Sequence, residues 1–266
     1  MITCTSGAAV AKGMAAPGGV AGGGWTAPVP GLYRAFDMRS SIPGSAGAWS
    51  RLREQFDVKT EEAKLGEHAL VLPELVDPIG YIEGRMAKAP AGDLPYWTKI
   101  WPAAIVLASF VSSRKGGSGR VLELGAGLGV PALVAACCGR QVVISDLEPD
   151  ALEFARAAVE LNELDDRVRV MALDWTDPPG DLGVFDTILG SEVLYHPPLY
   201  PTLVALLSRL LAPSGTVFIA HEERPFGISF FELAQESFVT RTTSCRVRPG
   251  KDREPTKVYL HALIRK

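Results

Sequence analysis

The sequence has few cysteines, no long apolar run and no excess of positive charge, and each shortage excludes a class of protein. The cysteines, at positions 4, 137, 138 and 245, have neither the spacing of a metal site nor that of a disulfide framework. A reducing compartment is therefore expected, and Cys137 and Cys138 are interpreted as small buried residues of a helix. No apolar run reaches the ~18 residues of a membrane helix. Because the net charge is −3, no general basic surface is expected, and neither nucleic acid nor a membrane is an expected partner.

The first 48 residues differ in composition from the rest of the chain. They are rich in glycine, alanine, serine and proline, and they contain no acidic residue before Asp37. A disordered tail, a start codon placed too early and an organelle transit peptide are the possible interpretations. A transit peptide would be rich in arginine, and only Arg34 and Arg39 occur here, so disorder and a cytoplasmic location are favoured over organelle import. Residues 49–266 are predicted to form one domain, with an accessory segment at about 49–93.

The rest of the chain is organised around residues 120–132. Val121 to Leu124 has the pattern of a buried strand, which leads into glycines at 125, 127 and 129 and then into a helix. Such a turn is expected to present free backbone N–H groups and a helix N-terminus to a ligand. A second apolar strand ends at Asp146, which follows Gly125 by 21 residues. About 20 residues are expected before an acid that binds ribose hydroxyls, so we interpret the turn as a nucleotide site and not as an ordinary turn.

The spacing of the glycines bears on which nucleotide binds. A dinucleotide site would have its third glycine at position 130, but that residue is Val130 and the glycine is Gly129. The run Glu123-Leu-Gly-Ala-Gly-Leu-Gly129 instead resembles motif I of the class I, seven-strand S-adenosylmethionine (SAM) methyltransferases. This resemblance implies SAM as the cofactor in place of NAD. The residues that it places at the cofactor are Glu123, Gly125, Ala126, Gly127, Asp146 and Leu147.

Two tryptophans, Trp97 and Trp101, precede this motif. Pro102 fits the first turn of a helix whose apolar body is residues 103–111. Either both tryptophans anchor the core, or one of them lines the cofactor pocket. The segment Trp-Pro-x-x-x-x-Leu resembles the entry segment of the protein-lysine methyltransferases related to the valosin-containing-protein lysine methyltransferase. That resemblance implies a cofactor contact for Trp101 and gives Trp97 no such role.

Hydrophobic periodicity outlines the remaining elements. Strands are predicted at residues 55–60, 121–124, 141–146, 168–173, 185–190 and 216–220, with a closing hairpin at 240–248 and 257–264. Helices are predicted at residues 103–111, 130–138, 150–162, 198–211 and 230–238. From about residue 96 onwards this order resembles the class I methyltransferase plan. It implies an α/β, Rossmann-like, seven-strand, mostly parallel sheet with an antiparallel last strand and helices on both faces.

Two further strand ends carry candidate site residues. Asp174 and Trp175 follow the third strand of the sheet, and an Asp-Trp pair there is similar to the same lysine methyltransferase family. The resemblance implies that Asp174 accepts from the adenine amine and that Trp175 stacks on the ring, although Trp175 could instead simply cap the sheet. Glu192 and Tyr195 follow the next strand and match the family pattern Asp-x-x-Tyr, with glutamate in place of aspartate. Ser191, directly before them, is placed at the cofactor.

The implied chemistry is methyl transfer to the amine of a protein lysine. A free lysine has a pKa of ~10.4, so it must lose a proton before it can attack. Glu192 is expected to hold and orient the amine, and Tyr195 is expected to form an aromatic wall beside it. His196 and His221 are alternative bases if the acceptor is not lysine, but each is more simply a surface or supporting residue.

Three hypotheses for the function remain open at this point. The first is a protein-lysine methyltransferase. The second is a SAM methyltransferase that acts on a small molecule or on a protein histidine. The third is a scaffold that binds the cofactor without catalysis, against which the complete glycine motif, Asp146 and Glu192 argue. The expected partner is thus a protein or small-molecule acceptor, no metal is expected, and the protein is expected to be a monomer.

Overall fold

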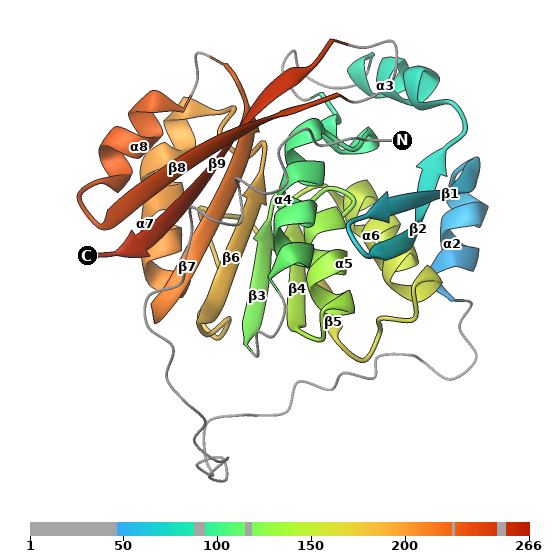
Figure 1. Cartoon of the computed structure of the whole chain (residues 1–266). Coiled ribbons are helices and arrows are strands. Elements are labelled where there is room, and N and C mark those ends of the chain that lie inside the picture. The colour runs from blue at the N-terminus through green and yellow to red at the C-terminus, as the bar shows by residue number, and fades with distance from the viewer. Residues whose placement is uncertain (1–46, 88–93, 115–118, 225–226, 249–253) are drawn as a thin grey trace, which may run out of the picture.

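The computed structural model describes residues 47–87, 94–114, 119–224, 227–248 and 254–266. Almost all of the predicted tail, residues 1–46, therefore lies outside the described residues. A seven-stranded sheet in the order β5-β4-β3-β6-β7-β9-β8 forms the centre of the described part (Figure 1). Its strands are β3 (Arg120–Leu124), β4 (Gln141–Asp146), β5 (Val168–Ala172), β6 (Phe185–Ser191), β7 (Leu211–Glu222), β8 (Phe238–Val247) and β9 (Thr256–Arg265).

Only β9 runs against the other strands of this sheet. It pairs antiparallel with both β7 and β8, whereas β3, β4, β5, β6 and β7 pair in parallel. The predicted Rossmann-like sheet with an antiparallel last strand is therefore confirmed. Because β3 is covered on both faces, four of its five residues are buried, which is the composition that a central parallel strand requires.

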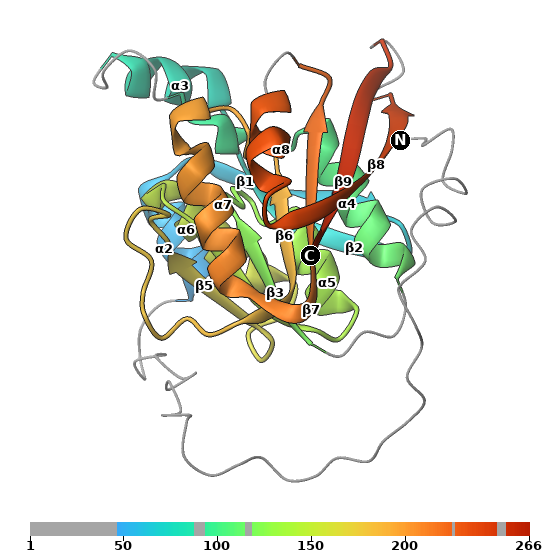
Figure 2. The same cartoon turned by 90° about the vertical axis from the view of Figure 1, so that its left-hand side faces the viewer.

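Helices cover both faces of the sheet, as predicted. The helices after the accessory segment are α4 (Pro102–Ser113), α5 (Val130–Cys137), α6 (Pro149–Leu161), α7 (Tyr200–Leu210) and α8 (Ile228–Ala234). One core cluster joins one face to α4, α5 and α6, and a second cluster joins the other face to α7 and α8. Figure 2 shows α7 and α8 on one side of the sheet and α4 and α5 on the other. Among the described residues, no helix is both long and apolar enough to span a membrane.

The accessory segment folds ahead of the sheet and attaches to α6. It consists of α2 (Ala48–Gln55), the antiparallel hairpin β1 (Val58–Leu65) and β2 (His68–Leu75), α3 (Pro78–Met86) and the short 3-10 turn η1 (Tyr96–Thr98). Asn162, just after α6, bonds the backbone of Val71 in both directions, at 2.9 and 2.7 Å. Tyr81 Oη donates to Asp150 at 2.5 Å, and Arg85 pairs with Glu148 at 2.9 Å. These contacts hold α3 beside the carboxyl end of β4.

Three local predictions differ from the structure. The strand predicted at 55–60 begins only at Val58, because residues up to Gln55 belong to α2. The helix predicted at 230–238 ends at Ala234, and Phe238 begins β8 instead. Cys137 is the last residue of α5 and is exposed, and Cys138 is half-buried 3.4 Å from His68 Nε2, so neither is a buried core residue. The first seven residues of α5 are buried and only its last residue, Cys137, reaches the surface, which the apolar run alone did not reveal.

Candidate active site

The glycine turn between β3 and α5 has the backbone geometry that its sequence predicts. Gly125, Gly127 and Gly129 have φ angles of 54°, 54° and 69°, in the left-handed region that glycine alone adopts freely. At Gly129 a Cβ would also lie 2.8 Å from Ile144 Cδ1, so a side chain there would force Ile144 of β4 to shift. At Gly125 a Cβ would lie 3.2 Å from Val193 and 3.6 Å from Trp175. The turn is therefore tightly enclosed by β4 on one side and by residues after β5 and β6 on the other.

The amides of this turn are largely used within the chain, which differs from the expectation of free N–H groups. Gly127 N donates to Asp146 Oδ2 at 2.7 Å. Ala126 N donates to the carbonyl of Ser145 at 3.0 Å, and Gly129 N donates to that of Ala126 at 2.9 Å. An anionic diphosphate would need these donors. The structure therefore disfavours NAD at this turn for a reason independent of the glycine spacing.

The side chain of Glu123, on β3, lies beneath the glycine turn and binds the backbone at the N-terminus of α5. This side chain is completely buried, and its Oε2 accepts from Ala132 N at 2.9 Å. The pKa of Glu123 is raised to about 8, chiefly by burial and to a smaller extent by the negative charge of Asp146, while the Ala132 amide opposes the rise. Its other oxygen, Oε1, has no partner among the described residues. The helix end that was expected to face a ligand thus faces an acidic side chain of the protein.

This donor and acceptor set suits a cationic cofactor such as SAM. Asp146 lies at the end of β4, half-buried, and its Oδ1 accepts from Glu148 N at 3.0 Å. Each carboxylate oxygen can accept a second hydrogen bond, so ribose hydroxyls can still bind Asp146 beside its two backbone donors. Leu147, next in sequence to Asp146, is 63 % exposed, where it can cover an apolar group at the rim.

The residues predicted for the adenine lie after β5, but they differ in their surroundings. Trp175 is half-buried, packs against the second core cluster and approaches Gly125. Asp174 is exposed, and its Oδ1 accepts from the backbone N and the hydroxyl of Thr176, at 2.8 and 2.6 Å. These bonds fix the loop after β5. The predicted contacts of both residues with adenine stay predictions.

The two tryptophans before α4 occupy different environments. Trp97 is 8 % exposed and packs against Phe154 and Tyr81, at centroid distances of 4.8 and 5.4 Å. Its Cβ is also 3.3 Å from the position of a Cβ on Gly127, so it supports the glycine turn from behind. Trp101 is only partly buried, and its Nε1 donates to the carbonyl of Tyr96 at 2.8 Å. Trp97 thus belongs to the core, whereas Trp101 faces the open side of the site.

Glu192 is held in an unusual conformation just beyond β6. Its φ is 56°, which is rare for a residue with a side chain and often marks a functional position. Its carboxylate accepts from the backbone N of Glu222 at 2.7 Å and pairs with Arg224 at 3.6 Å. Burial raises its pKa, while the Glu222 amide, Arg224 and Lys99 lower it, and the net direction is upward. A largely buried carboxylate at the carboxyl edge of the sheet is thus fixed in place, with a pKa above the ordinary value of a glutamate.

Aromatic rings and two cations lie near this carboxylate. Tyr195 is 59 % exposed and its ring lies 5.7 Å from that of Tyr96, which lies 6.1 Å from that of Trp101. Lys99 Nζ is 3.5 Å from the centroid of Trp101, and Arg224 Cζ is 5.3 Å from the same ring. Ser191, the last residue of β6, is half-buried beside Glu192. The fold therefore brings Trp101 to the predicted acceptor residues, Glu192 and Tyr195.

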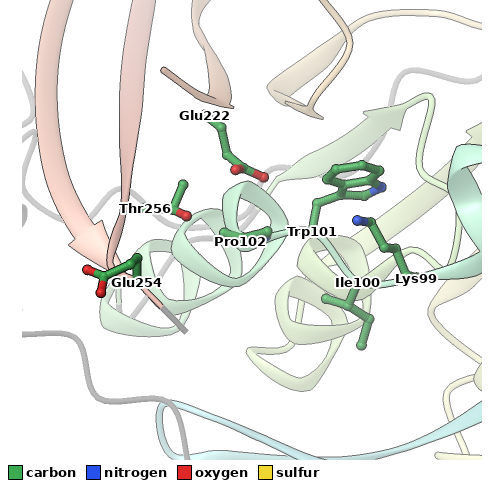
Figure 3. A pocket seen from close by; sticks show the side chains of 7 residues that line it. All are labelled: Lys99, Ile100, Trp101, Pro102, Glu222, Glu254 and Thr256. Carbon is green, nitrogen blue, oxygen red and sulfur yellow. The ribbon is translucent and has the colours of Figure 1, made fainter. Parts of the chain in front are cut away.

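A pocket of about 350 Å³ opens beside these residues. Figure 3 shows its lining, with the carboxylates of Glu222 and Glu254 on one side and the ring of Trp101 on the other. The remaining lining residues are Lys99, Ile100, Pro102 and Thr256. Its charged lining residues are two carboxylates and one cation, Lys99, so the lining keeps a net negative charge, which favours a cationic side chain.

Sequence reasoning missed several residues of this site. Arg224 and Lys99 received no role, although Arg224 binds Glu192 and both cations lie over Trp101. The polar run His221-Glu-Glu-Arg224 lies at the carboxyl end of β7, which pairs with β6. Polar residues at that strand end were the signal that could have identified this part of the site. Of the two histidines considered as bases, His196 is exposed, whereas His221 is partly buried and bonded to His261 at 2.9 Å.

Asp146→Ala is expected to weaken SAM binding by about 1.5–3 kcal/mol, the range for hydrogen bonds to a charged group. The substitution removes the acceptor of the ribose hydroxyls and also the acceptor of the Gly127 amide. Isothermal titration calorimetry measures the effect. Asp166→Ala, at an exposed carboxylate paired with Arg167, is the control. Unchanged affinity in a folded Asp146→Ala variant would contradict the assignment.

Trp97→Ala is expected to lower the free energy of unfolding by about 3–5 kcal/mol, as for other large aromatic residues truncated in a core. The reason is the loss of its packing against Phe154 and Tyr81. Trp175→Ala should instead raise the Kd for SAM, since its ring faces the turn. Urea unfolding and SAM titration of both variants separate the two effects. The reverse result would show that the roles of the two tryptophans are exchanged.

Comparison with known proteins agrees with this geometry. A family model described as lysine methyltransferase matches residues 95–244. The mouse EEF1A lysine methyltransferase 3 is 36% identical over 130 residues, which cover 47% of this chain and 56% of the relative. The zebrafish protein N-lysine methyltransferase METTL21A is 38% identical over 129 residues (46% and 58%), and the mouse histone-arginine methyltransferase METTL23 is 35% identical over 129 residues (46% and 51%). The chain spans about half the length of these curated relatives.

Solved structures bear on the fold alone. The SAM-dependent methyltransferase from Agrobacterium tumefaciens aligns with a TM-score of 0.54 and 17% identity, over 77% of this chain and 69% of that one. The family match begins just before Trp97 and includes the glycine turn, Asp146, Trp175 and Glu192. It covers more than half of the sequence and includes the strands that carry the site. The chain therefore belongs to the lysine methyltransferase family.

Proposed function

We propose that this protein is a SAM-dependent methyltransferase whose acceptor is the side-chain amine of a lysine in another protein. The observation that carries the proposal is the buried carboxylate of Glu192, fixed beside Trp101 and the acidic pocket. Membership of the lysine methyltransferase family supports it, as does the similarity to two lysine methyltransferases among the relatives above. An arrangement of acidic and aromatic groups is suited to a cationic acceptor and not to an anionic one.

The cofactor, when bound, supplies an electrophilic methyl group for in-line displacement from its sulfonium. The residues that fit it are Asp146 for the ribose, the turn from Gly125 to Gly127 for its methionine half, and Trp175 for the adenine. Because the turn amides are already bonded within the chain, these residues recognise SAM through their acceptors and shape and not through an anion site. The task left to the protein is to deliver a neutral amine in the correct direction.

Glu192 performs this task in the proposed mechanism. The lysine enters as an ammonium, which the pocket carboxylates and the aromatic rings attract. Because burial raises the pKa of Glu192, its carboxylate can accept a proton from the ammonium more readily than an exposed glutamate does. Once Glu192 has passed this proton on to solvent, the neutral amine has a lone pair to attack, and the Glu192 carboxylate accepts a remaining N–H to fix its direction. Tyr195 and Trp101 limit sideways movement of the amine.

Arginine in a protein is the second candidate acceptor. The observation that favours it is the sequence similarity to METTL23, a protein named as a histone-arginine methyltransferase. A guanidinium would also be attracted by Glu192, Glu222 and Glu254. It differs from lysine in that its pKa lies far above that of a lysine amine, so it does not lose a proton before attack in the same way. Because a lysine amine gives up its proton to Glu192 more readily than a guanidinium does, lysine is favoured over arginine.

The test is incubation of the purified chain with radiolabelled SAM and a protein lysate, followed by amino-acid analysis of the labelled protein. Methyl-lysine is expected. Methyl-arginine would replace the proposed acceptor by the second candidate, and label confined to small molecules would exclude a protein acceptor. Asp146→Ala serves as the control that removes cofactor-dependent labelling.

A further inference from the structure

A row of hydrogen-bonded polar side chains crosses the antiparallel end of the sheet, with His261 buried, His221 partly buried and Thr242 exposed. Thr242 on β8, His261 on β9 and His221 on β7 lie next to one another on the face covered by α8. The distance from Thr242 Oγ1 to His261 Nδ1 is 2.9 Å, and that from His261 Nε2 to His221 Nε2 is also 2.9 Å. His221 Nδ1 is 2.8 Å from the carbonyl of Glu222. The row therefore ends at the backbone that follows His221.

These contacts determine where the hydrogens are. The carbonyl of Glu222 only accepts, so Nδ1 of His221 carries a hydrogen and its Nε2 is the acceptor when the ring is neutral. Nε2 of His261 must then donate to His221, and Nδ1 of His261 accepts from the Thr242 hydroxyl. All donations in the row thus run in one direction, from Thr242 to the carbonyl of Glu222. Both rings are neutral in this arrangement.

The surroundings keep these rings neutral and immobile. His261 is 7% exposed, and the two imidazoles stack with an angle of 6° between their planes. Phe231 lies 4.0 Å from the ring of His261 and Tyr259 lies 5.6 Å from that of His221. Burial lowers the pKa of His221. Burial, together with the neighbouring His221 ring, lowers the pKa of His261 to about 3. The row is therefore a fixed structural device and not an exposed base for an incoming substrate.

The row ends at Glu222, the residue whose backbone N–H binds the carboxylate of Glu192. Glu222 presents its carbonyl to His221 and its N–H to Glu192 Oε1 at 2.7 Å. The backbone N of Glu192 in turn donates to the carbonyl of Ala220 at 2.9 Å. The last residues of β7 thus fix both the backbone and the carboxylate of Glu192. Any shift of Glu222 moves the acceptor carboxylate with it.

We propose that His221 is a positioning residue for Glu192, acting through its hydrogen bond to the carbonyl of Glu222. The proposal rests on the proposed function, in which Glu192 receives the acceptor amine. His221 itself does not touch the substrate or the cofactor in this view. His261 and Thr242 hold the His221 ring in the tautomer that donates to Glu222.

Two amide substitutions separate this role from simple packing. In His221→Asn, the side-chain amide lies near the position of Nδ1, so the donor to Glu222 is kept and the contact with His261 is lost. In His221→Gln, the amide lies near the position of Nε2, so the contact with His261 is kept and the donor to Glu222 is lost. We expect His221→Gln to reduce kcat by about tenfold to a hundredfold, the scale of a misplaced catalytic group, with little change in the Kd for SAM. We expect His221→Asn to stay near the wild-type kcat.

A second measurement does not depend on activity. Hydrogen exchange of the Glu222 amide, followed by NMR, reports the bond to Glu192 directly. Faster exchange at Glu222 in His221→Gln than in His221→Asn is expected. Equal exchange and equal kcat in the two variants, whether both normal or both reduced, would overturn the positioning role and leave only a packing role. If the wild-type chain transferred no methyl group to protein, the proposed function would fail, and the exchange result would still decide whether His221 positions Glu192.

Discussion

Replacing Glu192 by glutamine is expected to reduce methyl transfer to protein by about a hundredfold or more and to leave SAM affinity unchanged. Glutamine keeps the shape of the side chain, and its amide oxygen can still accept from the Glu222 amide. It loses the negative charge and the capacity to take a proton from the lysine ammonium. The loss should therefore appear in kcat and not in cofactor binding.

The measurement is transfer of labelled methyl groups to lysate protein, with SAM affinity from calorimetry on the same samples. Glu232→Gln, at an exposed position on α8, is the matched control and should behave as wild type. Glutamine at 192 has the same backbone requirement as glutamate, so the strained φ of 56° does not confound the comparison. Wild-type rates in Glu192→Gln would remove the proposed acceptor site.

The stability of the wild-type protein should fall as pH rises from about 5 to 8, and Glu123→Gln should abolish much of this fall. The pKa of Glu123 is raised from 4.5 to about 8, mainly by burial. Between these values the folded chain holds a proton that the unfolded chain has released. The free energy of unfolding therefore decreases with pH in this window, with a slope that approaches about 1.4 kcal/mol per pH unit.

Urea unfolding at a series of pH values from about 4 to 9 tests this expectation. Below pH 4.5 Glu123 of the wild type carries its proton in both the folded and the unfolded state, so the difference in stability between wild type and variant should be constant there. In the window above it, Glu123→Gln should gain stability relative to wild type, because its amide stays neutral and its oxygen can accept from Ala132. Other titrating groups are common to both proteins and cancel. Parallel pH curves for the two proteins would show that Glu123 has no raised pKa in the fold.

The sequence was most informative where local pattern and chain direction suffice. The strand and helix around the glycine turn were predicted within about a residue, because a buried parallel strand is a short apolar run and the next helix begins where the glycines end. Polar residues directly after such strands mark the carboxyl edge of the sheet, which is how Asp146 and Glu192 were found. Helix ends near the surface were less predictable, as at Ala234 and Cys137.

Pattern did not determine what each polar group binds. The glycine turn was expected to offer free amides, but Asp146, Ser145 and Glu123 take up amides of the turn and of the α5 N-terminus. Glu123 was predicted at the cofactor from the motif alone, and only the structure shows that it is buried against α5. A buried acid raises its pKa through loss of hydration, which depends on everything packed around it and not on its neighbours in sequence.

The sequence by itself determined the order of the elements, the glycine turn and the acids at the ends of β4 and β6. These follow from local hydrophobic periodicity, glycine conformation and the direction of parallel strands. Only the tertiary structure decided that Arg224 and the Glu222 amide bind the carboxylate of Glu192. It also decided that His221 on β7 and His261 on β9 are bonded to each other next to Glu222. Such contacts join residues that are 30 to 40 positions apart. They depend on the strand order β6-β7-β9-β8, and they form because polar groups buried by that order must find partners within it.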